Sequence, residues 1–209
     1  MKRLFVLSSM LLMIFATSWT AAADTVKLTG VGNTVWSGVY AGPYSATLNG
    51  ASISMVCVSF DRHVSVNQTW QAAVNPLTAS GVANGLYGAQ ANALLKYQQA
   101  AWLFDQMGVQ PNQAGEIHGA IWNIFNPVAT PDTNGSNAWL SVAQNQNFTN
   151  YDFSKFRILT PADRSVNGPQ ENLTTVPEPA TMFLLGTGLA GVAGAARRRS
   201  KARRSSEEM

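Results

Sequence analysis

The chain has 209 residues, a net charge of +3 and a single cysteine, Cys57. One cysteine excludes an internal disulfide, so packing and hydrogen bonds must hold the fold. The positive charge lies at the two ends, because residues 24–176 contain six lysine and arginine residues against eight aspartate and glutamate residues, a net charge of −2. This acidic balance gives no support to nucleic-acid binding. A body of about 150 residues is long enough for one domain with a buried core.

The first 23 residues have the pattern of a signal peptide. Lys2 and Arg3 precede an apolar segment, residues 4–16, and Ala21–Ala23 then supplies the small residues that signal peptidase recognises. The apolar segment is too short for a retained membrane-spanning helix. We therefore predict cleavage after Ala23 by signal peptidase, which leaves Asp24 as the first mature residue.

The first half of the body favours β-strands. Four segments are rich in β-forming residues or alternate apolar with small polar ones: residues 34–40, 44–48, 51–60 and 68–74. Asn49-Gly50 between two of them predicts a tight hairpin turn, since both residues tolerate a positive φ. The strand over 51–60 is apolar on both faces, with Ile53, Met55 and Cys57 on one and Val56, Val58 and Phe60 on the other. We expect this strand to be central in a sheet.

The second half of the body favours helices. Apolar residues at helical spacing predict helices over residues 90–107 and 111–125, and a shorter one from Ser136, as N-cap, to about residue 145. Residues 153–159 are predicted as a last strand, and 161–176 as a polar stem. The expected fold class is α+β: a globular body over 24–160 in which an antiparallel sheet packs against two or three helices.

The C-terminus has three parts in a fixed order. Pro177-Glu178-Pro179 favours an extended, non-helical segment. An uncharged apolar run, residues 180–196, follows, and as a helix it would be about 25 Å long, slightly short of the hydrocarbon core. A basic cluster comes last: Arg197, Arg198, Arg199, Lys201, Arg203 and Arg204. We predict a single transmembrane helix whose basic end stays in the cytoplasm, with the body on the other side of the inner membrane.

This arrangement over residues 177–209 resembles the PEP-CTERM sorting signal of Gram-negative bacteria. The resemblance implies recognition by an exosortase, a membrane enzyme that removes the anchor and releases or transfers the body. The alternative is an ordinary C-terminal membrane anchor.

Two segments of the body resemble the thioester domains of bacterial surface adhesins. One is Ser54–Phe60, where the family has its cysteine in a strand, and the other combines residues 101–104 with 117–122. In that family a glutamine three residues before an Ile-Trp pair forms an internal thioester with the cysteine. Here that position is His118, which has no acyl carbon, so these two positions cannot form the bond. Another glutamine, such as Gln113, would have to act as the donor.

Cys57 and His118 are the candidate site residues, and each has a structural alternative. Cys57 suits a small buried position, and His118 a hydrogen-bonded packing role. If they lie close together, a Cys–His nucleophile is conceivable, with the imidazole deprotonating the thiol. His118 with Asp61 and His63 could also hold a metal, although we predict no metal and no cofactor. Exposed aromatic side chains could stack on sugar rings.

From these observations we predict an exported protein that is not an enzyme. After processing it would reside at the cell surface or outside the cell, as part of a polysaccharide-associated matrix; this last role is implied by the resemblance alone. The expected partners are signal peptidase, an exosortase, and exopolysaccharide or other surface proteins. Two alternatives remain: a Cys57–His118 hydrolase or acyltransferase, and an adhesin that binds its target through a thioester.

Overall fold

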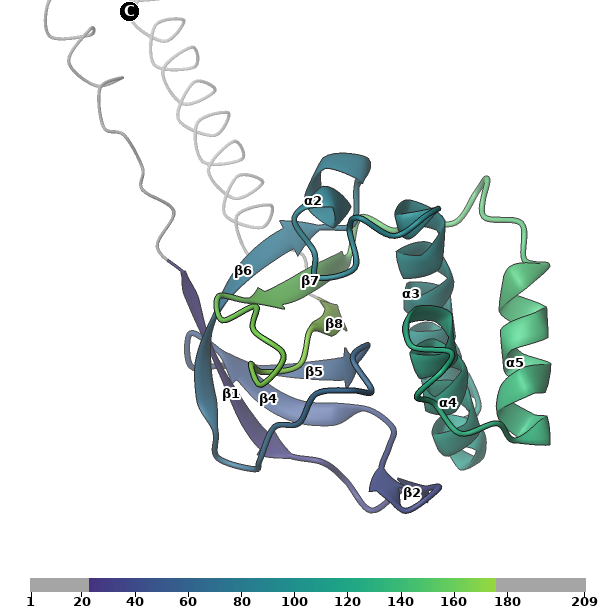
Figure 1. Cartoon of the computed structure of the whole chain (residues 1–209), viewed down its shortest axis with the longest axis horizontal. Coiled ribbons are helices and arrows are strands. Elements are labelled where there is room, and N and C mark those ends of the chain that lie inside the picture. Colours follow the sequence, from purple (N-terminus) through teal and green to yellow (C-terminus); the bar gives the residue numbers. More distant parts are fainter. Residues whose placement is uncertain (1–22, 176–209) are drawn as a thin grey trace, which may run out of the picture.

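The computed structural model describes residues 23–175 (Figure 1). Its strands are β1 (Asp24–Gly30), β2 (Val35–Trp36), β3 (Val39–Tyr40), β4 (Tyr44–Leu48), β5 (Ala51–Cys57), β6 (Thr69–Pro76), β7 (Phe156–Pro161) and β8 (Asn172–Thr175). Its helices are α2 (Ala79–Ala83), α3 (Ala93–Val109), the 3-10 turn η2 (Pro111–Gln113), α4 (Ala114–Phe125) and α5 (Asn134–Gln144). The predicted mixture of antiparallel strands and helices is therefore confirmed.

Six strands close into an antiparallel barrel in the order β1-β4-β5-β8-β7-β6. β1 closes one side, because Val26 lies opposite both Leu48 of β4 and Trp70 of β6. β8 closes the other side, since Leu173 lies opposite Val56 of β5 and Ile158 of β7. Closure leaves no free edge among these six strands. The sequence predicted an open sheet formed mainly by the first half of the body. The last strand predicted over 153–159 corresponds to β7, but β8 and the closure into a barrel were not predicted.

The Asn49-Gly50 turn forms as predicted. The two residues have φ values of 51° and 84°, and Leu48 pairs with Ala51 across the turn. The predicted strand over 34–40 is wrong as a single element. Ser37 and Gly38 also have positive φ, 48° and 83°, so the chain folds back into the small β2-β3 hairpin, which lies beside α4 at one end of the barrel (Figure 1).

The protein has two apolar cores, one inside the barrel and one between the barrel and the helices. β5 contributes to both, as its two apolar faces predicted: Met55 and Cys57 lie in the barrel core, and Val56 and Val58 in the core under the helices. Phe60 departs from the prediction. The strand ends at Cys57, so the chain turns and Phe60 packs against the barrel core instead.

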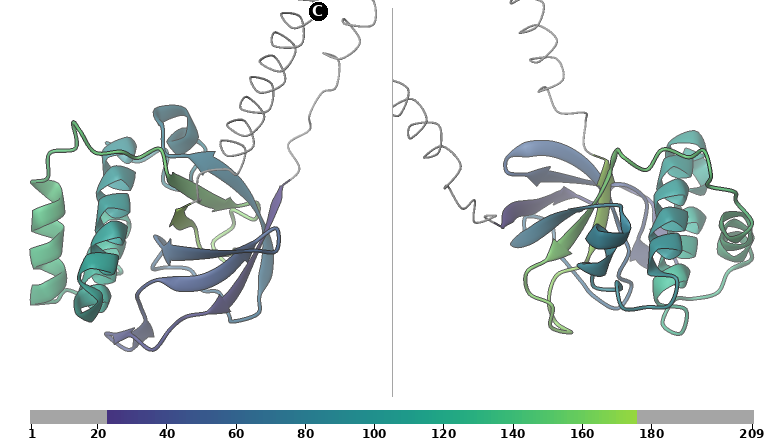
Figure 2. Two further views of the ribbon diagram at one scale, coloured as in Figure 1. Left: turned by 180° about the vertical axis from the view of Figure 1, so that it is seen from behind. Right: turned by 90° about the horizontal axis from the view of Figure 1, so that it is seen from above.

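The helices form layers on one side of the barrel. α3 and α4 lie next to it and α5 lies beyond them (Figure 2). The two long helices match their predictions to within a few residues. α5 begins earlier than expected, because Thr133 is its N-cap and Ser136 completes a capping box with it. The one-turn helix α2, between β6 and α3, was not predicted from the sequence.

The region predicted as a polar stem contains a strand. Asn172, Leu173 and Thr174 of β8 are fully buried and pair with two strands. The sequence suggested a stem because Leu173 is the only apolar residue of the β8 segment. In the barrel, Asn172 and Thr174 each donate a side-chain hydrogen bond to a backbone carbonyl, and the β8 backbone pairs with β5 and β7. The domain therefore extends to Thr175 rather than to residue 160.

Several predictions concern residues outside 23–175. They include most of the signal peptide, the Pro177-Glu178-Pro179 motif, the transmembrane helix over 180–196 and the basic cluster. Between residues 23 and 175, no helix combines the length and apolarity needed to cross a membrane.

Candidate functional site

Cys57 and His118 lie next to each other, and both are fully buried. His118 comes from α4, and its Nε2 lies 2.9 Å from the backbone carbonyl oxygen of Cys57 at the end of β5. Its Nδ1 accepts a 2.8 Å hydrogen bond from the backbone N–H of Gly42. Because Nδ1 accepts, the ring proton is on Nε2, which donates to the Cys57 carbonyl. The imidazole thus joins α4 to two segments of the barrel through backbone groups.

The imidazole of His118 is held in its neutral form. Burial lowers the pKa of His118 to about 3, although the hydrogen bond to the Cys57 carbonyl acts in the opposite direction. The ring also stacks on Trp122, one helical turn along α4, with ring centroids 3.8 Å apart. Tyr44 of β4 packs on it from the barrel, at 5.5 Å. The surroundings of His118 therefore suit a neutral packing residue.

The thiol of Cys57 is satisfied locally. Its Sγ donates to the backbone carbonyl of Ser59 at 3.2 Å and accepts from the Ser59 N–H at 3.3 Å. Burial raises the pKa of the Cys57 thiol to about 12, and the hydrogen bond from the Ser59 backbone N–H offsets only part of that effect. The reactive form of a cysteine is the thiolate, which this site disfavours.

The two residues are neighbours, but they lack the geometry of a nucleophile and its base. A Cys–His pair needs an imidazole nitrogen free to accept the thiol proton. In this site the accepting nitrogen of His118 is occupied by the Gly42 N–H. Gln113, the alternative acyl donor, is exposed, and its Oε1 accepts a 2.9 Å hydrogen bond from the indole of Trp139 on α5.

The suggested metal site is also not assembled. Both nitrogens of His118 are engaged by backbone groups, and Asp61 accepts a hydrogen bond from the Tyr87 hydroxyl. Within residues 23–175 no cluster of three or more His, Cys, Asp or Glu side chains could hold a metal ion.

An aromatic cleft borders the buried pair Cys57 and His118. It has a volume of about 300 Å³, and rings from four segments line it: Tyr40 of β3, Tyr44 of β4, Phe60 after β5, and Trp122 of α4. Tyr44 and Trp122 both contact His118, so they form a floor that separates Cys57 and His118 from the cleft. His63 and Gln170 add polar groups. Sequence reasoning did not find this cleft, because its residues come from parts of the chain that only the folded barrel brings together.

The β2-β3 hairpin beside the cleft is fixed to α4 by Trp36. The indole Nε1 of Trp36 donates to Glu116 of α4 at 2.9 Å. Its ring lies over two helix glycines, and a Cβ on Gly119 would come within 2.4 Å of it. Trp36 also packs on Trp122 with ring centroids 5.8 Å apart. The absence of side chains at Gly115 and Gly119 thus creates the groove that seats the hairpin.

Glu171 is a buried polar residue that the sequence placed in the stem. It is fully buried and accepts hydrogen bonds from the hydroxyls of Tyr97 and Thr160 and from the backbone N–H of Leu86. Burial raises the pKa of Glu171. The three hydrogen bonds lower this pKa, but by a smaller amount, so the net shift is upward. Its contacts join α3, the α2–α3 connection and β7 around β8, so we assign it a structural role.

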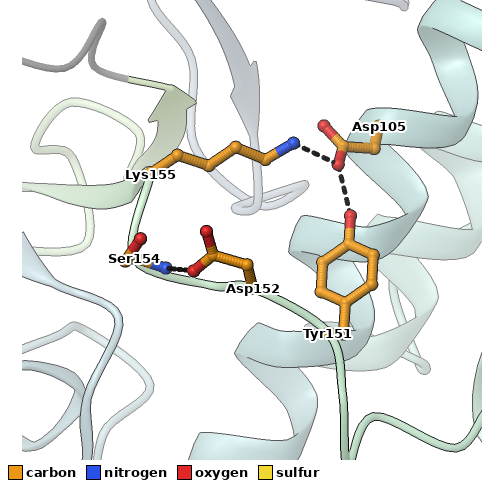
Figure 3. Close-up of polar contacts among 5 residues, drawn as sticks. All are labelled: Asp105, Tyr151, Asp152, Ser154 and Lys155. Atoms are coloured by element: carbon orange, nitrogen blue, oxygen red, sulfur yellow. Dashed lines mark hydrogen bonds and ion pairs between the residues drawn. The ribbon is translucent and has the colours of Figure 1, made fainter.

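A second polar cluster fastens the segment after α5 to α3 (Figure 3). Asp105 of α3 accepts hydrogen bonds from the hydroxyl of Tyr151 and, at 2.6 Å, from the ammonium of Lys155. Asp152 accepts from the backbone N–H of Ser154 at 2.8 Å. The Lys155 and Asp105 side chains are 43% and 29% exposed, and partly exposed ion pairs contribute little stability. This cluster therefore positions a loop.

Comparison with protein-family models identifies the end of the chain only. No curated protein and no solved structure matches the chain, and the resemblance of the body to thioester domains gains no support. The matched segment begins at residue 175, the last residue of β8. Over residues 175–199 the chain carries the PEP-CTERM protein-sorting motif, which marks an exported protein targeted to an exosortase.

Proposed function

We propose that this chain is an exported protein that is held briefly at the inner membrane by its C-terminal segment and is then released to the cell surface or medium by an exosortase. One observation carries the proposal: the targeting segments lie immediately outside the barrel. The predicted first mature residue, Asp24, is the first residue of β1. The matched sorting motif starts at residue 175, where β8 ends. Removing both ends would therefore leave every barrel strand in place.

The order of charges and apolar residues supports the proposed transit. Residues 180–196 carry no charge, and the basic cluster from Arg197 to Arg204 follows them directly. Positively charged flanks stay in the cytoplasm, so the body would lie on the opposite side of the membrane. The Pro177-Glu178-Pro179 motif then lies between the barrel and the apolar run, where an exosortase would act.

For the body we propose a non-enzymatic role in a polysaccharide-associated matrix. The environment of Cys57 and His118 supports this choice over a hydrolase or acyltransferase. The thiol pKa is raised and the imidazole pKa is lowered by burial, which is the reverse of what a thiolate–imidazolium pair needs. The thioester adhesin is disfavoured as well, because His118 occupies the position of the acyl donor.

Intact-mass measurement of the cell-associated and released forms tests the proposed processing. The released form should start at Asp24 and lack the segment from Ala180 to Met209. Glu178→Ala should reduce release, whereas Glu207→Ala, a matched change at a tail glutamate outside the motif, should leave release unchanged. A released protein that still carries the full tail would refute the proposal.

A further inference from the structure

The aromatic cleft at the end of the barrel has the make-up of a ligand site. Four aromatic residues line it, together with aliphatic side chains and the polar groups of His63 and Gln170. Ligand sites are typically apolar and aromatic with a few polar groups, and they occur at the mouths of β-barrels. The volume of about 300 Å³ lies at the lower end of the usual range of about 300–1,000 Å³. Such a volume suits a single ring better than a long chain.

The rim of the cleft exposes an aromatic side chain that folding does not explain. Tyr40 is 57% exposed, yet it lies on a hairpin that Trp36 holds firmly against α4. Its neighbour Tyr44 donates to the Tyr40 backbone carbonyl at 2.8 Å, which fixes this part of the hairpin further. The Tyr40 ring is thus presented by a rigid support, and a preorganised group loses little conformational entropy on binding.

The charge of the cleft limits the class of ligand. None of the described residues that line it is an aspartate, glutamate, lysine or arginine. Arg62 precedes the lining residue His63 but is not itself among the residues that line the cleft, and its Nη2 donates to the backbone carbonyl of Arg164 at 3.0 Å. A charged ligand would lose its hydration without gaining a counter-charge, which is unfavourable. The ligand should therefore be neutral.

We propose that this cleft binds a neutral sugar ring of a polysaccharide. A sugar ring has apolar C–H faces and a rim of hydroxyl groups, so it needs both aromatic surface and scattered hydrogen-bonding groups. Tyr40 and Phe60 supply the aromatic surface, and His63 and the Tyr40 hydroxyl supply hydrogen-bonding groups. The amide nitrogen of Gln170 already donates to the backbone carbonyls of Ser59 and Arg62, so only its oxygen is left for a ligand. The inference rests on the proposed matrix role and names the ligand class that the body would recognise there.

A purely apolar ligand fits the cleft less well. The cleft is partly open to solvent, and the exposed residues His63 and Tyr40 line it. An apolar ligand would leave these groups without partners and would itself stay partly in water, which reduces the gain from burial. A small aromatic compound is therefore the appropriate competitor in a binding test.

Isothermal titration calorimetry of the full chain in detergent tests the proposal. The neutral probes are maltohexaose, cellohexaose and mannohexaose; hexagalacturonate serves as the charged probe and indole as the apolar one. We expect at least one neutral hexamer to bind. Tyr40→Ala should weaken that binding at least about tenfold, which corresponds to about 1.4 kcal/mol. Val35→Ala is the matched control: Val35 is exposed and pairs with Tyr40 on the same hairpin, but it does not line the cleft.

Each outcome decides the question. Binding of a neutral hexamer that Tyr40→Ala weakens and Val35→Ala preserves supports the proposal. It is overturned if no neutral hexamer binds, if Tyr40→Ala binds as well as wild type, if hexagalacturonate binds equally well, or if indole alone binds. Because Tyr40 is exposed, an unchanged circular dichroism spectrum should show that its variant is folded. Processing is measured separately by mass, so a released, tail-free protein that binds no sugar would leave the proposed export intact and remove only this inference.

Discussion

His118→Gln should abolish a pH dependence of stability that the wild-type protein shows in mildly acidic solution. Burial lowers the pKa of His118 from 6.5 to about 3 in the folded state. The unfolded chain therefore binds a proton between these values and the folded protein does not. Stability from this group is complete above about pH 6.5 and is lost as the pH falls toward 3, at about 1.4 kcal/mol per pH unit. Between about pH 7 and pH 4 the loss is about 3 kcal/mol.

Glutamine suits this test because it offers one donor and one acceptor without titrating. Its amide can donate to the Cys57 carbonyl and accept from the Gly42 N–H, as the imidazole does. Urea unfolding followed by tryptophan fluorescence at about pH 7 and pH 4 gives the free energy of unfolding of each protein. Relative to wild type, His118→Gln should gain about 3 kcal/mol on acidification.

The comparison between variants separates this effect from other groups that titrate. Carboxylates such as Glu171 contribute to the pH dependence of both proteins, so their contributions cancel when the two curves are subtracted. A constant difference between wild type and His118→Gln at the two pH values would refute the reasoning. It would mean that the folded protein binds the imidazole proton as readily as the unfolded chain does.

The remaining predictions concern helix packing, the buried Glu171 network and access to the Cys57 thiol. Gly119→Ala should destabilise the protein by about 1–3 kcal/mol, because its Cβ would lie 2.4 Å from the buried ring of Trp36. Gly108→Ala, which meets nothing within 4 Å, should instead stabilise by about 0.5–1 kcal/mol; equal effects in urea unfolding would contradict both. Glu171→Ala should cost at least about 3 kcal/mol, because two buried hydroxyls and the partly buried Leu86 N–H lose their acceptor, and an unchanged thermal midpoint would speak against the network. Thiol reagents should label Cys57 slowly in the native protein and quickly in denaturant, whereas fast native labelling would show that the site is open.

Local signals in the sequence predicted local structure well. Asn49-Gly50 fixed a hairpin because its positive φ values can be inferred from residue type alone. The two-faced apolar pattern of residues 51–60 correctly indicated a strand buried on both sides. The helices over 90–107 and 111–125 followed from apolar spacing, and only their ends shifted. In each case the information lies within a few residues.

The predictions failed where burial depends on distant parts of the chain. Asn172 and Thr174 resemble residues of a polar stem, yet both are fully buried. Asn172 donates to the Gln170 carbonyl and Thr174 to the Ser54 carbonyl. The Gln170 carbonyl is a local partner, but only the pairing of β8 with β5 brings the Ser54 carbonyl within reach of Thr174. Similarly, Ser37 gave no warning of the positive φ that splits the strand predicted over 34–40.

The candidate site shows the same division. The sequence singled out Cys57 and His118, and the structure brings them together, but through the Cys57 backbone carbonyl rather than its sulfur. Residue type could not reveal this, because the decisive partner of His118 is the N–H of Gly42. The aromatic cleft was not predicted at all. Its residues have no common motif, and only closure of the barrel places Tyr40, Phe60 and Trp122 around one space.

The position of β8 links folding to the proposed processing. β8 hydrogen-bonds to β5 and β7, so the barrel is not closed until the chain up to Thr175 has taken its place. Without β8 the edges of β5 and β7 would be unpaired and open to association with other chains. The sorting motif matches from residue 175, directly after the closing strand. A cut at Pro177-Glu178-Pro179 would therefore detach the membrane segment without opening the barrel, whereas a cut a few residues earlier would expose both edges.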